Sequence, residues 1–266
     1  MIVVKIPKII HFIWLGTHPM HPRMGEWMRR WKTLHPDWNV LVWSDDTGLR
    51  SLRAKSLQPV SPRPEGLQFD GLSINICDVA RTIADYPGDP VEICFQKLLA
   101  DACHLSQRSN IWRYAVVHLY GGVYADIDVE PFKPIDHLVD DKEAFAASYL
   151  REPDHCGCSF FGATPRHSWT GDLVRLVRFQ DPTTSLSMGS VFFTSVTREH
   201  AEVSILPGKA VVHEYPSAIE SQALREQTLE SLSLRLRAHL DPETFAVHHF
   251  SSFWFPKGFE PLEAGK

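Results

Sequence analysis

QRSNIWRYAVVHLYGGVYADIDVE, residues 107–130, is the stretch of sequence that decides the fold. In its first half, apolar side chains recur every three or four residues, which is the spacing of one helix face. These side chains are Ile111, Trp112, Ala115, Val116 and Leu119. Ser109 is expected to cap the N-terminus of this helix, because serine oxygens accept the free amide protons there. The pattern therefore predicts a helix from Ser109 to about Tyr120.

The second half of the stretch predicts a turn followed by a strand. Gly121 and Gly122 allow the backbone to leave the helix sharply. Residues 123–129 then alternate with a period of two, as in a buried strand. Side chains two apart on a strand lie on the same face, so Asp126 and Asp128 are expected to point the same way.

Two carboxylates on one face can bind a divalent cation or its bound water. Oxygen ligands suit Mg²⁺ or Mn²⁺, hard ions that also bind a diphosphate. The alternative is that Asp126 and Asp128 are solvated acids at the end of a strand. The preceding Gly-Gly turn and the Ser-x-x-x-Arg helix favour the metal-binding interpretation.

The block SNIWRYAVVHLYGGVYADIDVE, residues 109–130, resembles the signature of glycosyltransferases that carry a DXD sugar-binding motif. These include glycosyltransferase family 32, typified by the fungal initiating α-1,6-mannosyltransferase, and more distantly the glucosylating domains of clostridial toxins. The resemblance implies an α/β GT-A fold, which is a Rossmann-like three-layer sandwich around a mostly parallel central sheet. It also implies a UDP- or GDP-sugar donor, a hexosyl transfer reaction and a Mn²⁺ or Mg²⁺ ion.

Length and composition set outer bounds. A chain of 266 residues with 44% hydrophobic content is expected to form one domain over residues 1–266. A net charge of −5 argues against general nucleic-acid binding. Neither a signal peptide nor an apolar run of membrane-spanning length is present in the sequence, which favours a cytoplasmic protein without a transmembrane segment. The five cysteines lack paired spacing, and Cys156 and Cys158 are interpreted as reduced thiols, with a soft-metal site as the alternative.

The first strand is expected over the apolar run Ile6 to Leu15, which is long enough to be buried on both faces. Trp14 lies near its C-terminal end, where open α/β sheets bind ligands. The resemblance implies that Trp14 packs on the nucleotide base, and a core tryptophan is the alternative. Further along the chain, Asp45 and Asp46 are expected to cap a helix.

The remaining elements follow from periodicity and from turn residues. Residues 56–90, rich in proline, are expected to be a loop insertion with a short helix near Leu72 to Ile83. Helices are predicted at residues 26–34, 91–104, 169–179 and 217–240. Strands are predicted at residues 39–43, 144–150, 158–163, 191–194, 203–206 and 210–212.

The second cluster of functional residue types is FAVHHFSSFWFPKG, residues 245–258. The resemblance implies a closing tail around residues 246–258. One of His248, His249 or Ser252 is expected to complete the metal shell, and Trp254 to close over the diphosphate. The family's serine next to this tryptophan is replaced by Phe253.

The helix supplies the other donor-binding candidates. Arg113 lies four residues after Ser109 and can bind a phosphate or sugar hydroxyls with its planar fork. Asn110 stands where family members usually carry aspartate, so it can accept a hydrogen bond but supplies no charge. The resemblance implies that Asp128 binds the metal directly, that Asp126 contacts ribose, sugar or a metal-bound water, and that the reaction retains anomeric configuration.

Two other functions remain open at this point. The sequence Asp126-Ile127-Asp128-Val129 also fits the nucleophile motif of haloacid dehalogenase phosphatases, although that motif normally opens its domain. Asn110 makes a nucleotide-sugar-binding protein without turnover a second alternative. No motif identifies the acceptor, which can be a glycan, a lipid, a protein or a modified nucleic acid.

Overall fold

A computed structural model describes most of the chain. The described residues are 5–16, 22–45, 66–69, 72–78, 99, 101–102, 104–181, 184, 187–212 and 240–249. Three candidate residues lie outside these ranges: Asp46, Ser252 and Trp254. The helix expected at 217–240 also lies outside them, except for residue 240. Most of the helix expected at 91–104 also falls outside them.

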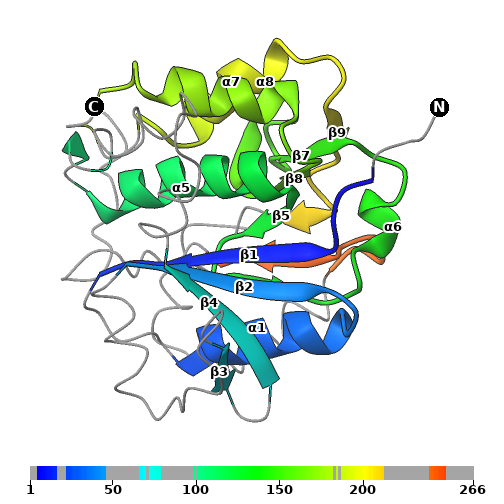
Figure 1. The fold of residues 1–266 in the computed structure, drawn as a ribbon. Coiled ribbons are helices and arrows are strands. Elements are labelled where there is room, and N and C mark those ends of the chain that lie inside the picture. The colour runs from blue at the N-terminus through cyan, green and yellow to red at the C-terminus, as the bar shows by residue number, and fades with distance from the viewer. Residues whose placement is uncertain are drawn as a thin grey trace, which may run out of the picture.

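An eight-stranded sheet forms the centre of the fold, in the order β3-β4-β2-β1-β5-β8-β7-β9 (Figure 1). The strands are β1 (Ile9–Trp14), β2 (Asn39–Ser44), β3 (Gly66–Phe69), β4 (Leu72–Asp78), β5 (Gly122–Ala125), β7 (Ala144–Ser148), β8 (Cys156–Ala163) and β9 (Ser204–Leu206). The run β4-β2-β1-β5 is parallel, whereas β8 is antiparallel to both of its neighbours. The sheet is therefore parallel through its middle and mixed toward its edges.

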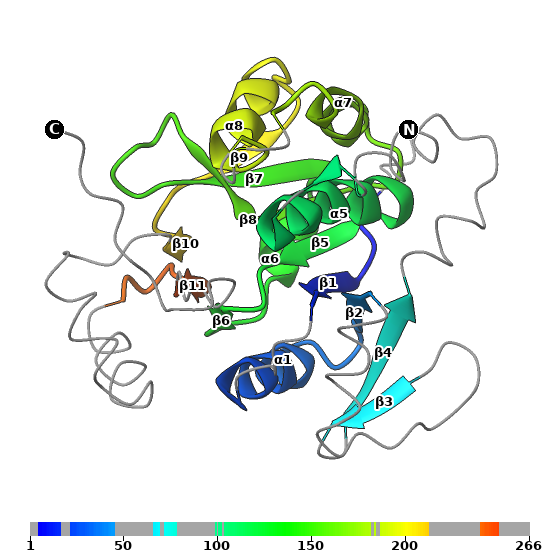
Figure 2. The ribbon, with the colours of Figure 1, turned by 90° about the vertical axis from the view of Figure 1, so that its left-hand side faces the viewer.

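A second, three-stranded sheet joins distant parts of the sequence. Its order is β10 (Val211–Val212), β11 (Ala246–His248) and β6 (Val129–Pro131). Strand β11 pairs antiparallel with β6, so that His248 lies opposite Val129. The small sheet lies beside the end of β5, between α1 and the strands β7 and β8 (Figure 2).

Helices cover both faces of the central sheet, which gives three layers (Figures 1 and 2). Helix α1 (Pro22–Leu34) covers one face, and α5 (Leu105–Tyr120), α7 (Ser168–Val177) and α8 (Ser190–Arg198) cover the other. A single-turn helix, α6 (Asp136–Val139), follows β6. Among the described residues, no helix has the length and apolar character needed to cross a membrane.

Alternate residues of β1 enter the two halves of the core. Phe12 and Trp14 belong to the cluster that includes Trp31 of α1, whereas Ile13 belongs to the cluster that includes Tyr114 of α5. Because both faces of the strand are buried, its sequence is apolar apart from His11. This confirms the expected first strand.

Gly121 and Gly122 make the turn from α5 into β5. Both have positive φ, at 64° and 94°, which side chains other than glycine adopt at a cost. A Cβ on Gly122 would also lie 2.6 Å from the carbonyl oxygen of Ile9 on the neighbouring strand. The expected turn is confirmed, and it brings the end of the helix directly against the sheet.

A buried histidine holds this turn in place. His11 on β1 donates from Nε2 to the carbonyl oxygen of Gly121 at 2.7 Å, while its Nδ1 accepts from Trp43 Nε1 at 3.0 Å. These two bonds fix the neutral tautomer, since protonated Nδ1 could not accept. Burial, only partly offset by the bond to Gly121, lowers the pKa of His11 to about 4.

The unfolding free energy is therefore expected to fall as the pH falls from 7 to 5. The pKa of His11 is about 4 in the folded chain and about 6.5 unfolded, so its contribution is present above pH 6.5 and lost on the way down. The loss between pH 7 and pH 5 is roughly 2 kcal/mol. Urea unfolding at both pH values measures it. The variant His11→Gln should start less stable but lose less on acidification, and an equal loss in both proteins would contradict the assignment.

The structure corrects two expectations around the carboxylate pair. Helix α5 begins at Leu105 with His104 as its N-cap, so Ser109 lies inside the helix. Strand β5 ends at Ala125, and Asp126, Ile127 and Asp128 form a turn before β6. The alternation over 123–129 therefore spans two short strands in different sheets.

Two further expectations are wrong for the described residues. Residues 72–78 form strand β4, paired with β2, and not the start of a short helix, and β3 pairs with it. Residues 191–194 lie in helix α8, because Phe192, Phe193 and Val196 pack on the core at helical spacing. In the second case, β-branched and aromatic residues favour a strand locally, but tertiary packing selects the helix.

The other expected elements are confirmed with small shifts of their ends. Helices α1 and α7 match the predictions at 26–34 and 169–179. Strands β2, β7, β8, β9 and β10 match those at 39–43, 144–150, 158–163, 203–206 and 210–212.

Candidate active site

Three side chains converge just beyond the C-terminal end of β5. Asp126 and Asp128 come from the turn after β5, and His248 comes from the end of β11. One ligand atom from each lies within 4.8 Å of the other two. His248 Nε2 is 3.2 Å from Asp128 Oδ1 and 3.6 Å from Asp126 Oδ2. No other such group of His, Cys, Asp and Glu side chains occurs within the described ranges.

Backbone bonds explain why these residues meet. The Asp126 amide donates to the Ser159 carbonyl on β8 at 2.8 Å, and the Val129 amide donates to the Asp126 carbonyl at 2.9 Å, which closes the turn. The His249 amide then donates to the Asp128 carbonyl at 3.1 Å, continuing the β11–β6 ladder. The register of this ladder brings His248 to Asp128 across about 120 residues of sequence.

The electrostatics of the cluster favour a cation. Burial lowers the pKa of His248, but the charge and hydrogen bond of Asp128 and the charge of Asp126 more than offset burial, so the pKa is raised above its usual range. The cluster thus places two carboxylates around one imidazole. Carboxylate oxygens and imidazole nitrogen are ligands that fit Mn²⁺, and the oxygens also fit Mg²⁺.

Asp126 is also held from the side of the helix. Arg113 Nη2 lies 3.1 Å from Asp126 Oδ1, and the Tyr124 hydroxyl donates to the same oxygen at 2.5 Å. The Arg113 guanidinium stacks over the Tyr124 ring, with its central carbon 4.7 Å from the ring centroid. Oδ1 of Asp126 therefore has the two shorter contacts with protein donors, whereas Oδ2 accepts a longer bond of 3.5 Å from Arg113 Nη1 and faces His248.

Arg113 is buried and is bound on several sides. It donates from Nη1 to the Cys158 carbonyl at 2.8 Å and from Nη2 to Ser109 Oγ at 3.2 Å. Burial lowers the pKa of Arg113, but the electrostatic effects of neighbouring acidic groups, Asp126 first among them, together outweigh burial and raise the pKa above its usual value. Ser109 and Arg113 thus act on Asp126 in this structure, through one connected set of contacts.

Several other candidates from the sequence are not part of the cluster of Asp126, Asp128 and His248. Trp14 ends β1 with 2% of its surface exposed, and Asn110 is buried on α5. Asp45 accepts a hydrogen bond from the Gly16 amide at 3.3 Å. Cys156 and Cys158 are free thiols, and burial raises the pKa of Cys156 to about 11, partly offset by Arg198.

His249 lies outside the cluster that contains His248. Its Nε2 contacts Glu130 Oε2 at 3.0 Å, and its ring stacks on Trp27 with centroids 4.5 Å apart and planes 4° from parallel. Glu130 and Tyr124 also contact residues of the candidate site, and neither was predicted from the sequence. Both lie two residues from an aspartate of the motif, and that spacing was the signal available.

A model of the glycosyltransferase sugar-binding region containing the DXD motif matches residues 22–145. This span runs from α1 through the carboxylate turn to the start of β7. The chain therefore has the GT-A fold and contains a region similar to the DXD sugar-binding region of glycosyltransferases. This confirms the predicted fold class and the resemblance seen in the sequence.

One curated protein is similar to this chain in sequence, and solved glycosyltransferase domains are similar to it in fold. Inositol phosphoceramide mannosyltransferase 1 of Schizosaccharomyces pombe is 24% identical over 218 residues, which cover 76% of this chain. The aligned part spans only 56% of that relative's length. The PaToxG glycosyltransferase shares the fold with a TM-score of 0.59 and 18% identity, covering 87% of this chain and 78% of its own. The UDP-bound glycosyltransferase domain of the YGT toxin has a TM-score of 0.55 and 9% identity, covering 90% and 92%.

Proposed function

We propose that this chain transfers a hexose from a nucleotide-sugar donor to an acceptor, and that the reaction depends on a divalent cation. The observation that carries the proposal is the convergence of Asp126, Asp128 and His248 from distant segments onto one point of a GT-A fold. A solvated pair of acids does not require a buried histidine from another strand.

Asp126, Asp128 and His248 would hold the cation, Mn²⁺ or Mg²⁺. When bound, the cation would neutralise the charge that develops on the diphosphate as the glycosidic bond breaks. The side chains of Asp128 and His248 are about 10% exposed and that of Asp126 is 21% exposed, so the ligand atoms are shielded but reachable. Shielding from water strengthens their interaction with the cation.

Arg113, Tyr124 and Ser109 are assigned to holding Asp126. Arg113 Nη2 and the Tyr124 hydroxyl engage Asp126 Oδ1, and Ser109 Oγ accepts a bond from the same Arg113 nitrogen. Oδ2, which accepts a longer bond of 3.5 Å from Arg113 Nη1, is assigned to the cation position. Trp14, Asn110, Ser252 and Trp254 remain proposed donor contacts, on the strength of the sequence resemblance. Transfer with retention of configuration is proposed on the same basis, and it needs no protein base if the leaving phosphate takes the acceptor proton.

The relatives supply candidates for the donor and the acceptor. The fission-yeast relative is named for mannosyl transfer to inositol phosphoceramide, which makes GDP-mannose and an inositol-phosphate headgroup one pair to test. UDP is the nucleotide bound in the YGT toxin domain, which makes UDP-sugars the other donors to test.

A screen of UDP- and GDP-sugars with Mn²⁺, followed by release of the nucleoside diphosphate, tests the proposal. We expect slow hydrolysis of one donor, dependent on Mn²⁺ and abolished by EDTA, and faster release when the acceptor is added. Tight Mn²⁺-dependent donor binding without release would instead support a nucleotide-sugar-binding protein. Phosphate release from simple phosphoesters without donor turnover would support the phosphatase alternative.

A further inference from the structure

A second layer of contacts lies directly behind the carboxylate turn. Glu130 on β6 contacts Arg30 of α1 at 3.1 Å through Oε1 and His249 at 3.0 Å through Oε2. His249 stacks on Trp27, one turn of α1 before Arg30. The side chains of Glu130 and His249 are each only 2% exposed, and Arg30 is 29% exposed.

This layer is joined to the ligand cluster through the backbone. Glu130 follows Asp128 by two residues, and His249 directly follows His248. The His249 amide donates to the Asp128 carbonyl at 3.1 Å. The backbone of His249 therefore extends the pairing of β11 with β6, while its side chain contacts Glu130. Trp31 of α1 adds a bond from Nε1 to the Val129 carbonyl at 2.9 Å.

Burial of the Glu130 carboxylate costs folding free energy, so stability alone does not explain this set of contacts. Burying a carboxylate is unfavourable unless it is paired and hydrogen-bonded, and apolar residues of similar size usually stabilise a fold at least as well. Directional bonds do, however, fix orientation. Glu130 uses each of its oxygens on a different element, α1 on one side and the segment after β11 on the other.

We propose that Glu130 and His249 are positioning residues that set the separation of Asp128 and His248, and with it the affinity of the site for the divalent cation. This inference rests on the proposed function. Arg30 and Trp27 of α1 hold the pair from behind. Side chains that hydrogen-bond directly to metal ligands commonly contribute 10–100-fold to affinity, and this pair acts on the ligands through the adjoining backbone.

Titration with Mn²⁺ alone, followed by the electron paramagnetic resonance signal of the free ion, tests the proposal on the whole chain. We expect His249→Gln and Glu130→Gln to raise the Mn²⁺ dissociation constant about 10-fold or more. In the transfer assay, the Mn²⁺ concentration for half-maximal rate should rise by the same factor, while kcat at saturating Mn²⁺ stays within a few-fold of the parent.

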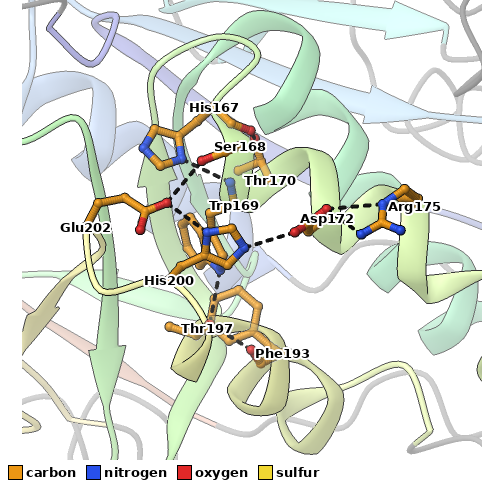
Figure 3. A network of polar contacts seen from close by, with 10 residues as sticks. All are labelled: His167, Ser168, Trp169, Thr170, Asp172, Arg175, Phe193, Thr197, His200 and Glu202. Carbon is orange, nitrogen blue, oxygen red and sulfur yellow. Dashed lines mark hydrogen bonds and ion pairs between the residues drawn. The ribbon is translucent and has the colours of Figure 1, made fainter.

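The chain offers a matched control in a second histidine–carboxylate network (Figure 3). His200, after α8, contacts Glu202 at 2.8 Å through Nδ1 and Asp172 at 3.2 Å through Nε2. It belongs to the α7–α8 side of the fold and is not part of the ligand cluster. His200→Gln therefore removes the same kind of pair and should leave the Mn²⁺ dissociation constant unchanged.

Arg30→Gln is a milder variant for the case that His249→Gln or Glu130→Gln fails to fold. Arg30 is partly exposed, and its substitution leaves the buried Glu130 and His249 in place. It should raise the Mn²⁺ dissociation constant a few-fold with a near-parent melting temperature. Unchanged Mn²⁺ affinity in His249→Gln, Glu130→Gln and Arg30→Gln would overturn the inference. Asp128→Asn separates the two claims: if it weakens Mn²⁺ binding and the three variants do not, only the positioning role fails, and if it does not, the metal site itself fails.

Discussion

Replacing Asp128 with alanine is expected to lower the transfer rate about 1,000-fold or more while the protein stays folded, because the substitution removes a direct ligand of the proposed cation. Asp128 Oδ1 lies 3.2 Å from His248 Nε2, so both ligands face the same point. The side chain lies on a turn and is not part of the apolar core. The melting temperature should therefore change by only a few degrees.

Rate measurements at saturating donor over a range of Mn²⁺ concentrations check this expectation. Asp128→Asn is the stricter variant, because asparagine keeps the shape and one oxygen but loses the charge. Asp172→Asn, in the α7–α8 network, is a control that removes a carboxylate away from the site. A rate for Asp128→Ala within 10-fold of the parent at saturating Mn²⁺ would make the metal assignment wrong.

Arg113→Leu is expected to destabilise the fold and to lower activity together. It removes a buried cation that bridges α5, β8 and the Asp126 carboxylate. Breaking one side of a buried ion pair costs roughly 3 kcal/mol, and here the Cys158 carbonyl also loses a donor. We expect a loss of this order in urea unfolding and at least a 100-fold loss of transfer rate.

Two milder variants divide this effect. Arg113→Lys keeps the charge but cannot reproduce the planar fork, so it should keep more stability than Arg113→Leu and still lose most of the activity. Tyr124→Phe removes only the 2.5 Å hydroxyl bond to Asp126 and should cost about 1 kcal/mol. If Arg113→Leu unfolded at the parent urea concentration, the contacts of Arg113 would not support the fold.

Local patterns in the sequence were sufficient for much of the fold. The apolar run around Phe12 predicted a doubly buried strand, and the Gly121-Gly122 pair predicted the turn that His11 holds. Such features depend on neighbours in the sequence, so periodicity and turn chemistry detect them. Residues 191–194 were misassigned because their β-branched and aromatic composition is local, whereas the packing that makes them a helix is not.

The candidate site was only partly readable for the same reason. Asp126 and Asp128 were found from the motif, but the turn that presents them depends on the pairing of β6 with β11. From the sequence, His248 and His249 were equally good candidates for a metal ligand. The register separates them, and it directs one toward Asp128 and the other toward Glu130. Ser252 and Trp254 lie outside the described residues, and their roles in a closing tail stay predictions.

Calorimetric titration of the chain with UDP and with GDP, in the presence and absence of Mn²⁺, tests the central claim most directly. One nucleoside diphosphate should bind at least 10-fold more tightly with Mn²⁺ than without it, because the cation would connect the diphosphate to Asp126, Asp128 and His248. In Asp128→Asn this difference should disappear. Equal affinity with and without Mn²⁺ in the parent protein, or a Mn²⁺ effect that survives in Asp128→Asn, would contradict the account.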